Sequence, residues 1–146
     1  MLGAVLAKQK ARAAYAAMSR KDLDAIATAL ADECVFEFPG QSVMSGRMEG
    51  KQAIVAWFRS WFAAAPRIQF RVTRVAVDNI FALGASNGLL AEWHLSETNA
   101  EGKTFEMTGV TALDVKRGKL VHVRDYIFNP QVLEQAWGRA HPPAAA

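Results

Sequence analysis

The stretch 103–129 constrains the fold more than any other part of the chain. Residues 104–115 and 120–128 are both rich in the β-branched and aromatic residues that favour strands. The segment 116–119 separates them, and its Gly118 can take the positive φ that a tight hairpin turn requires. The sequence therefore predicts two long antiparallel strands joined by a hairpin.

The second of these strands carries a carboxylate, Asp125, in an otherwise apolar row. Strand alternation places Asp125 on the same side as Val121, Val123 and Ile127. A charged carboxylate in a dry interior costs free energy unless it is paired or protonated. Asp125 therefore faces either solvent or a cavity in which a perturbed carboxyl is useful. The alternation favours the cavity.

Hydrophobic periodicity predicts the remaining elements. The predicted helices are 5–18, 23–30, 51–62 and a short closing helix at 131–137, and the further strands are 33–38, 68–77 and 89–96. Helices followed by a run of strands indicate an α+β fold. We expect three N-terminal helices packed on a curved antiparallel sheet, with a cone-shaped cavity between the layers that suits a ligand. One domain is predicted at 1–140, followed by a flexible tail at 141–146.

Composition excludes several function classes. The chain has 146 residues and a net charge of +3, with the basic residues spread along it, so no nucleic-acid partner is expected. Cys34 is the only cysteine, and His94, His122 and His141 show no metal-ligand spacing, so we expect no metal. No membrane span, signal peptide or glycine-rich phosphate loop is predicted, which favours a cytoplasmic protein without a cofactor.

Several short motifs, taken in their order along the chain, resemble the NTF2-like superfamily, in particular its SnoaL-like and limonene-epoxide-hydrolase-like branches. They cover most of the chain, at Tyr15, 21–24, 30–33, 38–40, 49–54, 86–89, 118–120 and 124–126. The resemblance implies a cone-shaped α+β fold. It implies a less definite function, because one fold of this kind hosts enzymes, ligand binders and scaffold proteins.

The resemblance also implies roles for individual residues. Asp125 matches the carboxylate that epoxide hydrolases of this branch place at the floor of the cavity. Their partner Arg-x-Asp pair falls on Glu92 and His94, so the arginine and one aspartate are absent here. A histidine and an aspartate in one cavity resemble instead the acid/base pairs of SnoaL-like cyclases.

Ketosteroid isomerases of the superfamily give a second comparison. Their general base precedes the proline that ends the first strand, and that position here is Phe38. Glu37 lies one residue earlier and would face the opposite side of the strand. It is interpreted as an exposed strand residue, whereas Tyr15 lies close to the position of the isomerases' helix tyrosine.

The face that strand 89–96 presents to the cavity stays open at this point. Hydrophobicity alone would turn Trp93 inward, whereas the register implied by the family turns Glu92 and His94 inward. We expect the second arrangement, with Asp125 and His94 as an acid/base pair and Glu92 beside them. If Trp93 fills the cavity instead, that pair fails and a binding protein is favoured.

Two function classes follow from these alternatives. The first is a cofactor-free SnoaL-like enzyme that isomerises, cyclises or hydrolyses a small hydrophobic molecule by acid/base chemistry, and the second is a non-catalytic binding or scaffold protein. In either case we expect a homodimer that covers the outer sheet face at Trp93 or Tyr126. The predicted ligand-binding residues are Tyr15, Phe36, Phe38, Trp57, Trp61, Met107 and Val123.

Overall fold

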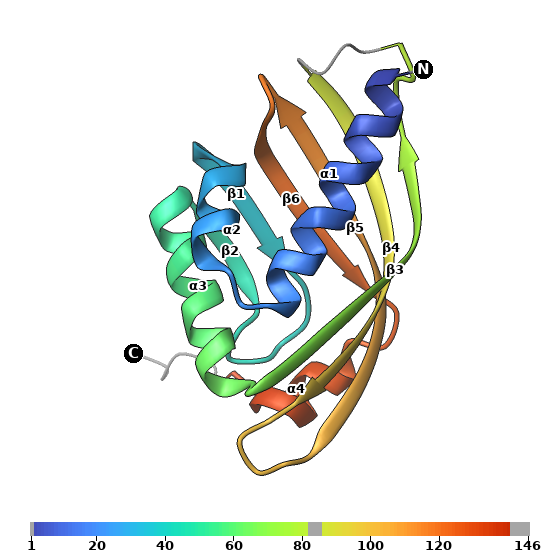
Figure 1. The fold of residues 1–146 in the computed structure, drawn as a ribbon. Helices are drawn as coiled ribbons and strands as arrows, with labels where there is room; N and C mark the ends of the chain where they lie inside the picture. The colour runs from blue at the N-terminus through green and yellow to red at the C-terminus, as the bar shows by residue number, and fades with distance from the viewer. Residues whose placement is uncertain (1, 82–85, 141–146) are drawn as a thin grey trace.

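The computed structural model describes residues 2–81 and 86–140, so the predicted tail at 141–146 lies outside the described residues. Helices α1 (Leu2–Ser19), α2 (Leu23–Ala29) and α3 (Lys51–Ala64) lie on one face of a twisted sheet, and α4 (Gln131–Trp137) lies at one end of it (Figure 1). All four predicted helices are present. Only α1 and α2 precede the first strand, however, because α3 follows the second one.

The sheet has six strands and is mixed, which corrects the prediction of an antiparallel sheet. The strands are β1 (Leu30–Phe38), β2 (Gly46–Glu49), β3 (Arg67–Val77), β4 (Ser86–Thr98), β5 (Thr104–Lys116) and β6 (Lys119–Ile127), in the spatial order β2-β1-β6-β5-β4-β3. The pair β1–β6 is parallel and the others are antiparallel. Alternation along a strand reports its faces but not the direction of a distant partner, so the sequence could not show this pairing.

The predicted central hairpin is formed by β5 and β6. Lys116 pairs with Lys119 at its end, and the two residues between them have positive φ, 50° at Arg117 and 76° at Gly118. Positive φ at both central residues defines the turn that matches the right-handed twist of paired strands. Both strands of the hairpin contribute residues to the lining of a pocket, among them Thr111 on β5 and Asp125 on β6.

A β-bulge in β6 changes the face of one predicted residue. Asp114 pairs with His122 and the next residue of β5 pairs with Leu120, so Val121 is the extra residue. A bulge leaves one residue unpaired and bends the strand. Leu120 consequently takes the pocket-lining position that alternation assigned to Val121, while Val123 and Asp125 keep their predicted side.

The helices are tied to one another beside the pocket. Lys21, between α1 and α2, donates from Nζ to the carbonyl oxygens of Phe62 at 2.8 Å and Ala65 at 2.5 Å. These carbonyls are at the end of α3, where helical partners are missing. On the same helix, Ile54 and Trp61 are buried against the sheet. This arrangement fixes α3 as one wall of the space between the two layers.

Candidate active site

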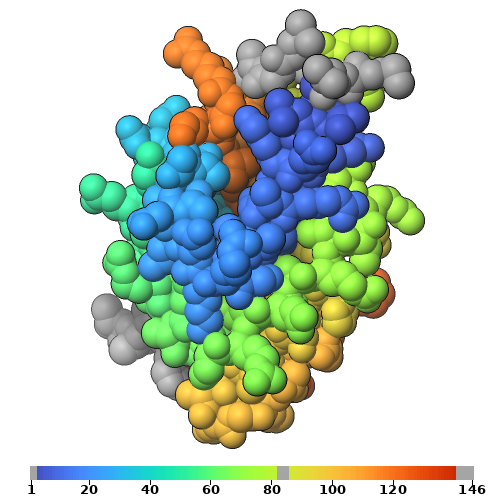
Figure 2. Space-filling model, in the orientation of Figure 1, coloured from blue at the N-terminus to red at the C-terminus, as the bar shows by residue number. Residues whose placement is uncertain are grey.

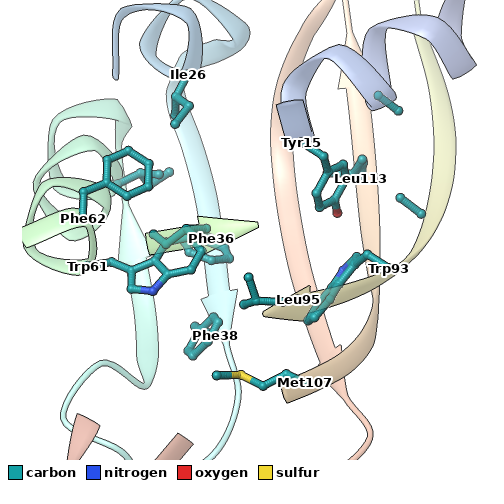
Figure 3. Packing of buried hydrophobic residues seen from close by; sticks show 14 of the residues in the cluster. Tyr15, Ile26, Phe36, Phe38, Trp61, Phe62, Trp93, Leu95, Met107 and Leu113 are labelled. Atoms are coloured by element: carbon teal, nitrogen blue, oxygen red, sulfur yellow. The ribbon is translucent and has the colours of Figure 1, made fainter. Parts of the chain in front are cut away.

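A pocket of about 630 Å³ lies between the helices and the sheet. Figure 2 shows a hollow between α1 and α2, with part of the β5–β6 hairpin behind it. All seven side chains predicted to contact a ligand line the pocket, as does Asp125: Tyr15, Phe36, Phe38, Trp57, Trp61, Met107 and Val123. In Figure 3, Phe36 and Trp61 lie on the α3 and β1 side, opposite Tyr15 and Trp93.

Asp125 lies on β6 with its carboxylate turned into this largely apolar pocket. Burial raises the pKa of Asp125 from an ordinary 3.8 to about 7, against a hydrogen bond from Thr111 that acts to lower it. Desolvation disfavours the charged form of a carboxyl, and no cation among the described residues pairs with this one. Asp125 is therefore a group that gains and loses a proton near neutral pH.

Thr111 connects Asp125 to Trp93. Thr111 and Asp125 lie directly opposite each other on β5 and β6, and the Thr111 hydroxyl lies 2.5 Å from Asp125 Oδ1. Trp93 Nε1 donates to the same hydroxyl oxygen at 2.9 Å. An indole N–H can only donate, and a threonine hydroxyl has one hydrogen. That hydrogen therefore points to Asp125 Oδ1. Among residues 2–81 and 86–140 no donor reaches Oδ2, which stays accessible from the pocket.

Tyr15 completes the group from the side of α1. Its pKa is raised well above the ordinary value, first by burial and then by the negative charge of Asp125, and a hydrogen bond with Thr111 opposes this. Its ring also packs edge-on against Phe70, with centroids 5.1 Å apart. The Tyr15 side chain therefore lies at the same Thr111 hydroxyl that Trp93 and Asp125 contact. Tyr15 thus stays protonated beside Thr111.

Gly109 provides the space that the Trp93 indole ring occupies beside this group. The two residues are directly paired on β5 and β4. A Cβ at Gly109 would lie 2.6 Å from Trp93 Cζ2 and 2.6 Å from the carbonyl oxygen of Tyr126. Such distances are far inside van der Waals contact, so only glycine leaves room for the indole. Glycine in a strand interior is a recognised sign of close approach, and it is the sequence signal that could have located Trp93.

The predicted inward position of His94 and Glu92 is wrong. Trp93 is buried and lines the pocket, whereas Glu92 is exposed and His94 lies on the outer sheet face. There, His94 Nε2 lies 2.9 Å from Glu106 Oε2. An aromatic side chain buries about 150–250 Å², worth roughly 4–6 kcal/mol at 25 cal/mol per Å². Turning Trp93 outward would lose this, so hydrophobicity decides the face.

Glu37 lies outside the pocket, as interpreted from the sequence. Its carboxylate contacts His122 Nε2 at 2.6 Å and an Arg47 nitrogen at 3.2 Å. The hydrogen bond with His122 is the main cause that lowers the pKa of Glu37, with a smaller contribution from Arg47. A carboxylate held in its charged form on the outer face is not a base for a ligand inside.

Glu97 is a buried acid that the sequence analysis missed. Its two carboxylate oxygens accept from Trp61 Nε1 at 2.8 Å and from Trp137 Nε1 at 2.6 Å. Burial raises the pKa of Glu97, and the two indole hydrogen bonds oppose that change. Glu97 is on the same face of β4 as Trp93, so the alternation that turns Trp93 inward also predicts it. With both oxygens occupied, it fastens α3 and α4 to the sheet.

Metal-binding and membrane-spanning features are limited in the described part of the chain. Within residues 2–81 and 86–140, no group of three or more His, Cys, Asp or Glu side chains is placed to hold a metal ion. Over the same residues, every helix falls short of the length and apolar character needed to cross a membrane.

Solved structures with the same fold include enzymes. An NTF2-like protein from Burkholderia pseudomallei is 16% identical with a TM-score of 0.74, over 87% of this chain and 94% of that one. A candidate isomerase from Bacillus subtilis is 25% identical, with a TM-score of 0.69, and the alignment covers 88% of this chain and 89% of that one. An LEH-like epoxide hydrolase from M. tuberculosis is 17% identical, with a TM-score of 0.71, and the alignment covers 92% of this chain and 90% of that one.

Sequence comparison gives the family. None of the curated proteins matches this chain significantly. The family model for the SnoaL-like domain matches residues 11–123, which include Tyr15, Trp93 and Thr111 and end two residues before Asp125. The match spans most of the chain and agrees with the NTF2-like fold of the structural relatives. The chain therefore belongs to the SnoaL-like family.

Proposed function

We propose that the pocket binds a small hydrophobic molecule and that Asp125 transfers a proton to and from it. The observation that carries this proposal is the Asp125 carboxyl group, which has a pKa of about 7 inside an apolar pocket. A general base works best when its pKa lies near the operating pH. The pocket volume of about 630 Å³ is within the usual range for small-molecule sites.

The arrangement supports a mechanism with one acid/base group. Thr111 holds Oδ1, so Oδ2 of the ionised carboxylate is the atom that takes a proton from the bound molecule. The protonated Asp125 can then return the proton to another position of the same molecule. Such a step needs no second titratable side chain, which matters because His94 lies on the outer face.

This mechanism favours isomerisation or cyclisation over hydrolysis. Both reactions move a proton between two positions, and one carboxyl can serve as base and then as acid. Epoxide opening by water needs a base for the water and an acid for the ring oxygen in the same step. Asp125 supplies one of these at a time. The structural likeness to a candidate isomerase agrees with the first choice.

The test is proton exchange into a panel of apolar cyclic ketones in deuterated water, followed by NMR. The wild-type protein should exchange the hydrogens beside the carbonyl of at least one ketone, with a rate that rises through pH 7. Asp125→Asn should reduce this rate at least about 100-fold. Asp114→Asn, which changes an outer-face carboxylate bound to Arg124, is the matched control and should keep the rate. Equal rates in wild type and Asp125→Asn would contradict the proposal.

A non-catalytic binding protein is the second candidate, and the outward position of His94 is the observation that favours it. In that case Asp125 only contributes a hydrogen-bonding group at the floor of a carrier pocket. Ligand binding by wild type and Asp125→Asn, together with no exchange in any ketone, would favour this candidate.

We also propose that the protein forms a homodimer through its outer sheet face. Leu90 on β4 and Tyr126 on β6 are 51% and 58% exposed there. They lie on either side of β5, whose Ala112 pairs with Leu90 and whose Val110 pairs with Tyr126. Trp93 cannot belong to this interface, in contrast to one predicted alternative, because it is buried in the pocket. An apolar area on a sheet face is a reason for association.

A further inference from the structure

The ionisable side chains that line the pocket include one acid and three basic residues among those described. Asp125 is the only acid among the described lining residues, and it lies deep beside Thr111. The basic residues of the same lining are Lys10, Arg20 and Lys119. All three are exposed, so they lie where the pocket meets solvent.

Two of the three basic side chains already have a polar partner in the protein. Arg20 lies 4.0 Å from Asp22. Lys119 donates from Nζ to the carbonyl oxygen of Thr28, and its charge contributes to lowering the pKa of Asp32. Lys10 has no ion pair or hydrogen-bond partner within residues 2–81 and 86–140. Lys10 is thus the uncompensated charge at the pocket wall.

Lys10 and Lys119 lie toward the same end of the pocket, away from Asp125. In Figure 1, the N-terminal end of α1 and the β5–β6 turn, where Lys119 begins β6, lie toward the same end of the molecule. Lys10 precedes Tyr15 by five residues, about 7–8 Å along a helix axis. Lys119 precedes Asp125 by six residues, about 20 Å along a strand. Lys10 and Lys119 therefore line the pocket at a distance from Asp125, which lies beside Thr111.

We propose that the ligand is an amphipathic organic acid, with an apolar body and a carboxylate that Lys10 receives at the mouth. This inference rests on the proposed function, because it assumes that the pocket is the ligand site. A carboxylate at the floor would be desolvated and repelled by ionised Asp125. Lys10 and Asp125 therefore favour one orientation, with the carboxylate at Lys10 and the uncharged end of the molecule at Asp125 Oδ2.

The test compares two fluorescent probes that share an aromatic body and differ in one anionic group. 1-Anilinonaphthalene-8-sulfonate carries a sulfonate, whereas N-phenyl-1-naphthylamine is neutral. Lys10→Gln should weaken binding of the sulfonate about two- to five-fold, as expected for one exposed charge pair. It should leave the affinity for the neutral probe unchanged. Added salt should weaken the sulfonate complex of the wild type more than that of Lys10→Gln.

Two control variants locate the effect. Lys8→Gln removes a neighbouring exposed charge of α1 that does not line the pocket, and it should change neither affinity. Val123→Trp fills the pocket from β6 and should reduce binding of both probes at least ten-fold.

The possible failures are distinguishable. Lys10→Gln could leave the affinity for the sulfonate probe unchanged, or lower the affinities for both probes equally. Either result would contradict the proposed contact between Lys10 and an anionic group, and would leave the pocket as the ligand site. If Lys8→Gln has the same effect as Lys10→Gln, the attraction is to the general charge of α1 and the proposal is overturned. If the wild type binds neither probe, or Val123→Trp binds both normally, the pocket proposal itself fails.

Discussion

Thr111 and Asp125 face each other across β5 and β6 with the threonine hydroxyl 2.5 Å from Asp125 Oδ1. Trp93 supplies the hydrogen bond that leaves this hydroxyl only one direction in which to donate. The carboxyl is thereby held at one oxygen and left open at the other. This relationship gives the pocket an oriented acid/base group without a second titratable residue.

Replacing Asp125 by Asn should stabilise the protein at high pH. The rise in the pKa of Asp125 from 3.8 to about 7 corresponds to a loss of at most about 4 kcal/mol in the free energy of unfolding, at 1.36 kcal/mol per pKa unit. Since the side chain is partly accessible from the pocket, we expect Asp125→Asn to increase the free energy of unfolding by about 2 kcal/mol at pH 8. The amide oxygen can still accept the Thr111 hydrogen bond, so the fold should be kept. Urea denaturation at several pH values measures the difference.

The pH dependence of this gain has a defined sign. The folded-state pKa of Asp125 is raised, so its contribution to stability is fully present below pH 3.8 and is lost as the pH rises to about 7. The gain from Asp125→Asn should therefore be near zero at pH 4 and constant above about pH 8. A gain of equal size at pH 4 and pH 8 would show that charge burial is not its cause.

Thr111→Val should raise the pKa of Asp125 further. The Thr111 hydrogen bond favours the ionised carboxyl, and valine has the same shape without the hydroxyl. The variant also leaves Trp93 Nε1 without its acceptor, at a cost of about 1–3 kcal/mol in the free energy of unfolding. Carboxyl NMR titration measures the pKa. Thr108→Val, on the outer face of β5, is the control, and an equal pKa change in both variants would contradict the assigned role.

Glu97→Gln should destabilise the protein although the two side chains have nearly the same shape. Trp61 and Trp137 each donate to one carboxylate oxygen. The amide NH₂ of glutamine would face one indole N–H, leaving a buried donor unpaired at a cost of about 1–3 kcal/mol. Urea denaturation followed by tryptophan fluorescence measures this. Glu106→Gln, which removes the exposed partner of His94, should cost less than about 1 kcal/mol. A smaller loss for Glu97→Gln than for Glu106→Gln would refute the assigned role.

Sedimentation should show a dimer at micromolar concentration, and Tyr126→Lys should dissociate it. Placing a charge within the proposed interface opposes burial of that face. Val43→Lys introduces the same charge at another residue that is 58% exposed, outside the sheet, and should leave the dimer intact. A wild-type monomer would overturn the proposed assembly.

The sequence predicted the framework because its signals are local. The hairpin follows from Gly118 between two strand-forming runs, and α3 from an apolar stripe that includes Ile54 and Trp61. Asp125 was placed in the pocket by the alternation of its own strand. Each of these predictions uses residues within one or two elements.

The remaining features depend on contacts between distant segments. The parallel pairing of β1 with β6 joins Val35 to His122, which local alternation cannot detect. The roles of Thr111 and Gly109 follow from their partners on neighbouring strands, so the register of β4 against β5 had to be known first. For His94, the register implied by the family resemblance was preferred over the hydrophobicity of Trp93. The burial energy of the indole shows that the opposite weighting was correct.

The titration of the Asp125 carboxyl tests the account most directly. ¹³C NMR of the side-chain carboxyl, assigned by comparison with Asp125→Asn, gives its pKa without any knowledge of the substrate. A carboxyl buried in an apolar pocket and held by one neutral hydrogen bond should titrate at about 7. A pKa near the ordinary value of 3.8 would place the carboxylate in a solvent-like environment and contradict the proposed acid/base role.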